Sequence, residues 1–159
     1  MSTQQVTMYT DGSARGNPGP GGFGTILMAG AYRKELSQGY KHTTNNRMEL
    51  MAVIEGLKAL KKKGIDVTIY SDSQYVINSV QKGWLQNWIR TKFSGGKKNK
   101  DLWMEYHRLS QDFTIKFIWV KGHAENVNNN RCDQLATMAA DNGPWLVDEG
   151  FKRDEGLLM

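Results

Sequence analysis

The sequence has almost no cysteine and no long apolar segment. Its 159 residues include a single cysteine, Cys132, which cannot form an internal disulfide and suits a reducing compartment. Hydrophobic residues make up 39% of the chain, and no stretch approaches the roughly 18 apolar residues that a membrane span requires. The first ten residues lack the basic start and apolar core of a secretory signal. We therefore expect a cytoplasmic protein with no membrane partner.

The chain also lacks internal repeats and long low-complexity linkers. Its length is typical of one domain and allows a core to form without disulfides. No heptad pattern or broad apolar surface indicates assembly, so we expect a monomer. We place the domain at residues 1–142. The following segment contains Gly143, Pro144 and mixed charges, which predict a partly disordered C-terminal tail over residues 143–159.

Positive charge is concentrated in one segment of the chain. The net charge is +5, and the segment from Lys82 to Lys100 holds six basic residues and no acid, leaving 15 basic and 16 acidic residues elsewhere. Trp84 and Trp88 lie within this segment, and aromatic rings beside cations suit a nucleic-acid backbone. Packing of the two tryptophans against the core is an equal alternative. For three lysines, binding to a polyanion is favoured over a merely solvated loop: Lys97, Lys98 and Lys100.

Apolar periodicity predicts alternating strands and helices. Strands are expected at residues 6–11, 22–29, 31–40, 67–72 and 113–120, with a hairpin at Gly30 and a turn-forming segment at 12–22. Helices are expected at 48–60, 73–80 and 101–111 and around Cys132 to Ala139. This order predicts an α/β fold: a five-stranded mixed sheet, its first three strands antiparallel, flanked by helices.

Four acidic residues are candidates for a metal site. Two of the predicted strands end alike, in Tyr9-Thr10-Asp11 and Tyr70-Ser71-Asp72, and neighbouring strands would bring these carboxylates to one sheet edge. Glu49 is expected in the first turn of a helix, and Asp133 in the last helix. Converging carboxylates suit magnesium, and two such ions can activate water and stabilise the leaving oxygen in phosphodiester hydrolysis.

Each of these acids has a structural alternative. Asp11 could be an ordinary turn residue, and Asp72 could cap a helix. Glu49 follows Asn46 by three positions, as in a capping box. Asp133 could be a solvated helical acid.

The residues around these acids resemble the bacterial type 1 ribonuclease H family. The resemblance covers roughly residues 5–141 and rests on several long, separated blocks: Tyr9–Ser13, Gly16–Gly22, Thr43–Leu50, Ser71–Val76, Trp119–Ala124 and Asn130–Asp133. It implies a ribonuclease H-like fold. It also implies an endonuclease that hydrolyses the RNA strand of RNA/DNA hybrids, leaving 3′-hydroxyl and 5′-phosphate ends.

The resemblance assigns roles to the candidate residues. Asp11, Glu49, Asp72 and Asp133 match the family's metal-binding acids, which would hold two Mg²⁺ ions with Mn²⁺ as a possible substitute. His123 matches a loop histidine with an auxiliary role in proton transfer or product release, and an unperturbed histidine can exchange a proton near neutral pH.

Several further residues match positions that contact the hybrid. Asn17, Asn45, Asn46 and Gln74 correspond to residues that contact the groove and backbone, and Thr44 to part of a phosphate pocket for the DNA strand. Asparagine and glutamine offer both a donor and an acceptor, although Asn17-Pro18-Gly19 can equally be a turn. Residues 82–100 match the family's basic protrusion.

Two other functions are compatible with such a set of acids. An exonuclease or integrase of related fold also gathers carboxylates around two metals, but the groove residues and the protrusion argue against it. A binding module that has lost catalysis is opposed by the complete set of four acids.

Overall fold

The computed structural model describes residues 4–121 and 126–154. Strands β1 (Gln5–Ala14), β2 (Gly19–Ala29) and β3 (Tyr32–Thr43) form an antiparallel unit, with Gly30 at positive φ in the turn between β2 and β3. β4 (Ile65–Ser71) pairs with β1 in parallel, and β5 (Phe113–Trp119) pairs with β4 in parallel. The mixed sheet and the three antiparallel first strands confirm the predicted fold class.

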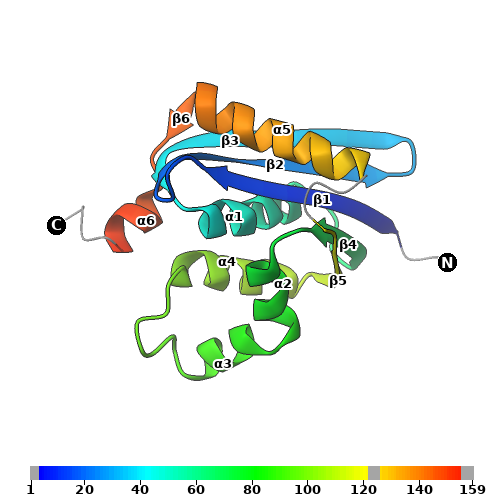
Figure 1. Cartoon of the computed structure of the whole chain (residues 1–159). Coiled ribbons are helices and arrows are strands. Elements are labelled where there is room, and N and C mark those ends of the chain that lie inside the picture. Colours follow the sequence, from blue (N-terminus) through cyan, green and yellow to red (C-terminus); the bar gives the residue numbers. More distant parts are fainter. Residues whose placement is uncertain (1–3, 122–125, 155–159) are drawn as a thin grey trace.

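Helices cover both faces of this sheet (Figure 1). α5 (Val127–Asn142) lies on one face, and α1 (Asn45–Lys58) lies on the other, where α4 (Lys100–Ser110) packs against it. α2 (Gln74–Gln81) and α3 (Trp84–Arg90) follow β4. The main core fills the space between the sheet and α1, where Met8, Leu50 and Ile69 are fully buried. Among the described residues, no helix has the length and apolar character needed to cross a membrane.

The sheet has six strands instead of the predicted five. The additional strand, β6 (Trp145–Leu146), pairs in parallel with β3, and the sheet order is β5-β4-β1-β2-β3-β6. A strand of two residues has no alternating pattern that a sequence can reveal.

Residues 145–154, which lie in the tail expected to be partly disordered, contain β6 and a short helix, α6 (Glu149–Asp154). Regular secondary structure therefore continues past residue 142, where we expected the domain to end. Residues 155–159 lie outside the described part of the chain.

Candidate metal centre and adjoining cleft

Asp11 lies inside β1 and not at its end. The parallel pairing of β1 with β4 stops at Tyr9 and Tyr70, but β1 continues to Ala14 against β2, where Asp11 faces Gly24. The sequence prediction ended this strand at Asp11 because the glycine-rich segment that follows is typical of turns; part of that segment instead extends the hairpin. Asp11 thus stands beside the carboxyl end of β4 while its own backbone stays fixed in the sheet.

Asp72 follows directly after β4, and its side chain is not a helix cap. The residue that caps α2 is Ser73, whose hydroxyl accepts a hydrogen bond from the Val76 amide at 3.2 Å. Ser71 Oγ accepts a second one from the Ser73 amide at 3.0 Å. Local hydrogen bonds therefore fix the backbone on both sides of Asp72, and its carboxylate is not used for capping.

Glu49 reaches the same place from α1. The N-cap of this helix is Thr44, whose hydroxyl accepts from the Arg47 amide at 3.2 Å, and no acid lies in the first turn. The first-turn position and the alternative capping box with Asn46 were therefore both wrong. A Cβ atom at Gly12 would lie 2.3 Å from the Glu49 backbone nitrogen, so the glycine allows β1 to touch α1. This close approach sets Glu49 beside Asp11.

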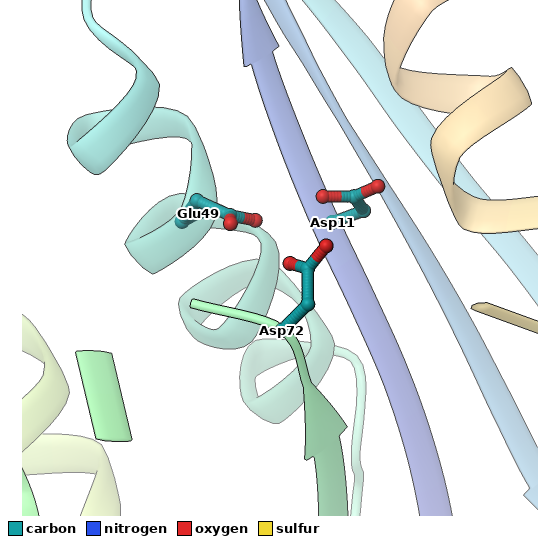
Figure 2. Close-up of side chains that lie close together, drawn as sticks. All are labelled: Asp11, Glu49 and Asp72. Atoms are coloured by element: carbon teal, nitrogen blue, oxygen red, sulfur yellow. The ribbon is translucent and has the colours of Figure 1, made fainter. Parts of the chain in front are cut away.

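The three side chains point toward one another from three different elements (Figure 2). Each offers one oxygen, and these oxygens all lie within 4.8 Å of one another. Asp11 Oδ1 accepts from the Gly12 amide at 2.9 Å. Glu49 Oε1 and Asp72 Oδ1 are buried and have no hydrogen-bond partner within the described residues. Buried carboxylate oxygens without a partner are costly, which indicates that this group is built to receive a cation.

Burial and mutual repulsion disfavour the charged state of this group. Burial, followed by the charge of Asp72, raises the pKa of Asp11 to about 7, and Asp133 adds a smaller effect in the same direction. Burial also raises the pKa of Glu49 well above its usual range, with the charges of Asp11 and Asp72 contributing. A divalent cation would reverse both effects because it stabilises the ionised carboxylates. The residues therefore fit a divalent metal.

Asp133 lies nearby on α5 but outside the three-acid group. The preceding residue, Cys132, is buried, and its thiol lies 3.2 Å from the carbonyl oxygen of Tyr9 on β1. This contact holds α5 against the strand that carries Asp11. His123 falls outside the described residues, so its predicted role remains a prediction.

A cleft of about 610 Å³ adjoins the N-terminus of α1. Five of the residues predicted to bind substrate line it: Asn17, Thr44, Asn46, Lys97 and Lys98. Asn45 stands between two residues of this lining, Thr44 and Asn46. Its side-chain oxygen accepts a hydrogen bond from the Ala14 backbone amide at 2.6 Å, and its backbone amide donates one to Asn17 Oδ1 at 2.9 Å. These bonds hold the segment that contains Asn17 in place. Amide, hydroxyl and ammonium groups thus converge on one cleft.

The other predicted binding residues are distributed differently. Gln74 is exposed and lines a second hollow of about 320 Å³ with Lys82 and Trp119. Trp84 is 41% exposed, and the Lys82 ammonium lies 5.8 Å from its ring centre. Trp88 is half-buried, with its ring centre 6.0 Å from that of Trp103, which favours the packing interpretation for this residue. Lys100 is exposed at the start of α4 but is not part of the cleft lining.

Sequence reasoning missed two features of this region. Phe151 of α6 lines the cleft, and the buried Arg47 joins α1 to Asp148, just before α6. The hydrogen bonds between Arg47 and Asp148 join positions about a hundred residues apart, so no local sequence pattern predicts them.

The sequence is similar to known proteins over most of its length. The sequence model of the family described as RNase H matches residues 3–141, so the match ends before β6 and α6. Ribonuclease H of Syntrophus aciditrophicus is 49% identical over 155 residues, covering 93% of this chain and 87% of that protein.

Solved structures extend the likeness to the fold. The crystal structure of LC9-RNase H1, a type 1 RNase H with the type 2 active-site motif, has a TM-score of 0.81 and 29% identity and covers 96% of this chain and 81% of that one. LC11-RNase H1, solved in complex with an RNA/DNA hybrid, has a TM-score of 0.65 at 24% identity, with 86% and 96% coverage, and shows the shared fold alone.

Proposed function

The chain belongs to the ribonuclease H family and is a metal-dependent endoribonuclease that hydrolyses the RNA strand of hybrids, and we propose that it does so with two metal ions. In this proposal Asp11, Glu49, Asp72 and Asp133 hold two Mg²⁺ ions, with Mn²⁺ as a substitute. The Asp11 carboxylate would help to hold both ions. The products carry 3′-hydroxyl and 5′-phosphate ends.

One observation carries this proposal: oxygens of Asp11, Glu49 and Asp72 converge within 4.8 Å, and two of the three acids have a buried oxygen without a partner. Structural acids on a protein surface are normally solvated or paired with a cation. Here they come from β1, from the residue after β4 and from α1, and their side chains point toward one another. Such an arrangement disfavours folding unless it binds a cation, so a metal-binding function explains it.

Different side chains would serve different steps of the reaction. When bound, the two ions supply an activated water and stabilise the departing 3′ oxygen. β1, the end of β4 and α1 hold the carboxylates in fixed positions, so that the protein orients the reacting groups before the reaction begins. The water oxygen forms a bond to phosphorus and gives up a proton to solvent, while the bond between phosphorus and the 3′ oxygen breaks and that oxygen takes up a proton. We assign help with this proton, or with product release, to His123.

Recognition of the hybrid is proposed for the cleft and the basic segment. Asn17, Asn45, Asn46 and Gln74 would contact the groove and backbone, and Thr44 a phosphate of the DNA strand. Lys97, Lys98 and Lys100, with the exposed Trp84, would neutralise and stack against the backbone. Trp88 would support this surface from within. We propose that the protein acts as a monomer in the cytoplasm.

Cleavage of three end-labelled duplexes of one sequence tests the proposed function. An RNA/DNA hybrid, a DNA duplex and an RNA duplex are incubated with the protein, with Mg²⁺, with Mn²⁺ and with EDTA. We expect internal cuts in the RNA strand of the hybrid alone, only with a divalent ion, and products whose 5′ ends carry phosphate.

The same assay separates the alternatives. Progressive shortening from one end would indicate an exonuclease, and cuts in the DNA duplex would indicate an integrase-like nuclease. Binding of the hybrid with no cleavage under any metal would indicate a non-catalytic module. Any of these results would overturn the proposal.

A further inference from the structure

A buried arginine fastens the C-terminal segment to the rest of the protein. Arg47 is 1% exposed, and its guanidinium donates to both oxygens of Asp148, from Nε at 2.8 Å and from Nη2 at 2.9 Å. It also donates to both oxygens of Asp101 in α4, at 2.9 and 2.7 Å, while Thr43 Oγ1 donates to Asp148 at 2.7 Å. Planar, two-point pairing of this kind fixes orientation as well as distance. α6 therefore has a fixed position beside α1, as Figure 1 shows.

α6 lies directly on this cluster of ion pairs. Asp148 Oδ1 also accepts a hydrogen bond from the Phe151 amide at 3.3 Å, so the carboxylate that pairs with Arg47 anchors the first turn of α6. A Cβ atom at Gly150 would lie 1.9 Å from Asp101 Oδ2 and 2.7 Å from Arg47 Nη2. Only a residue without a side chain allows this approach. The position of the next residue, Phe151, is set by these contacts.

Phe151 contributes an aromatic ring to a cleft that is lined mainly by polar residues. Its half-buried side chain lines the cleft together with Asn17, Thr44, Lys97 and Lys98. The amide, hydroxyl and ammonium groups suit the oxygens of a phosphate. A phenyl ring offers no hydrogen bond, so it suits the carbon face of a nucleotide. One cleft thus presents both kinds of surface that a nucleotide unit has.

We propose that Phe151 is a substrate-contact residue whose ring packs against a deoxyribose of the DNA strand while the polar groups hold the adjoining phosphate. This inference rests on the proposed function, because it takes the hybrid as substrate. A ribose 2′-hydroxyl pressed against the ring would lose water without gaining a partner. The 2′ methylene of deoxyribose instead removes apolar surface from water. The ring therefore favours the strand that lacks 2′-hydroxyls.

The variant Phe151→Ala tests this inference, with Leu146→Ala as the matched control. Leu146 is an exposed apolar residue of the same C-terminal segment that lies outside the cleft. Binding is measured by fluorescence anisotropy in EDTA, which prevents metal-dependent cleavage. The two probes are a uniform RNA/DNA hybrid and a hybrid whose DNA strand contains several ribonucleotides. Thermal unfolding of each variant, and kcat and KM with Mg²⁺, complete the set.

For Phe151→Ala we expect Kd and KM for the uniform hybrid to rise about fivefold, the lower range for one aromatic contact, while kcat stays nearly constant. The preference for the uniform over the ribonucleotide-containing hybrid should shrink, because the ring no longer disfavours 2′-hydroxyls. Leu146→Ala should leave both quantities unchanged. Phe151→Leu retains apolar bulk and should give intermediate values, which keeps the test decisive if the alanine variant is unstable.

A lower melting temperature with unchanged Kd and unchanged preference would make Phe151 a structural brace and overturn the inference. An equal loss of affinity for both hybrids would exclude a sugar contact and overturn it too. If the wild-type chain binds hybrid without cutting it, the proposed function fails, yet the inference stands where affinity and preference shift as expected. Failure of the wild-type chain to bind hybrid at all would overturn both.

Discussion

Two groups of charged residues meet at α1, one around Arg47 and one around Glu49. They differ in whether each charge has an opposite partner. Arg47 lies between Asp101 and Asp148 and makes four short hydrogen bonds to them, so each charge has an opposite partner. Glu49, two residues further along, faces Asp11 and Asp72 and has no cation within the described residues. The group around Arg47 is complete in that each charge has an opposite partner, whereas the three-acid group is complete only with a metal.

The pKa directions follow this difference. Burial alone would raise the pKa of Asp101, but the hydrogen bonds and charge of Arg47 lower it below the usual range. At Asp11, burial and the neighbouring Asp72 act in the same direction, and the pKa rises to about 7. A carboxyl group that is shielded from solvent is thus stabilised in its charged form beside an opposite charge and destabilised in that form beside a like charge. A residue that stabilises the fold, Arg47, and a residue of the proposed metal site, Glu49, thus lie two positions apart in one helix.

The largest expected effect comes from neutralising the incomplete group. Asp11→Asn should lower turnover by at least about a thousandfold, since it removes a metal-binding charge, while the folded structure and hybrid binding persist. Steady-state cleavage and urea unfolding measure the two properties. Asp66→Asn, the same change at the opposite end of the neighbouring strand β4, is the control and should keep normal turnover. Near-normal activity of Asp11→Asn would contradict our assignment of the acid.

Breaking the complete group should affect stability most. Arg47→Met leaves Asp148, which is 3% exposed, without its partner, and we expect a loss of about 3 to 5 kcal/mol in the free energy of unfolding. Arg15→Met is a matched control, because Arg15 pairs with Asp141 on the surface with both side chains about half exposed. Solvent screens this pair, so the variant should lose much less stability than Arg47→Met. Equal losses in the two variants would mean that the buried pairs contribute no more than a surface pair.

The pH dependence of stability distinguishes the two groups further. In metal-free protein, folding raises the pKa of Asp11 from its usual value of 3.8 to about 7, so the folded state holds a proton that the unfolded state releases. This contribution is fully present below pH 4 and is lost as pH rises toward 7, by at most about 4 kcal/mol. We therefore expect Asp11→Asn to gain stability over the wild type between pH 5 and about 7.5, measured by urea unfolding in EDTA. Added Mg²⁺ should stabilise the wild type more than the variant. A constant difference across this pH range would show that Asp11 is ionised normally.

The smallest effect on stability is expected for charges that are exposed. Replacing Lys97, Lys98 and Lys100 with alanine should change the free energy of unfolding by less than about 0.5 kcal/mol, because these lysines are solvated. It should nevertheless raise KM with kcat nearly unchanged, and flatten the dependence of log affinity on log salt by somewhat under one unit per lost phosphate contact. The matched control replaces Lys61, Lys62 and Lys63, a second lysine run outside the cleft, and should alter neither quantity. If KM and the salt dependence changed equally in both triple variants, the cause would be the lower net charge and not the loss of the proposed phosphate contacts.

The sequence predicted the main helices and strands well because they depend on local patterns, and three of the four acids that it singled out lie together in the structure. The alternation in residues 6–11 and the helical spacing after Met48 reflect burial on one face, which is visible in a few consecutive residues. The continuation of β1 past Asp11 was missed because glycines mark turns and close packing equally. The pairing of Arg47 with Asp148 had no signal either, since it depends on how two distant segments meet.

The short strand β6 also affects how copies of this protein meet one another. β3 is an outer strand of the main sheet, and β6 covers only Gly39 and Tyr40 on its free side. Further along, β3 presents Arg33, Lys34 and Glu35, charged side chains that discourage a second molecule from adding its own strand there. The two-residue cover therefore protects the stretch of edge that lacks such charges. Removing it should make the protein prone to edge-to-edge aggregation at high concentration, even where each copy remains folded.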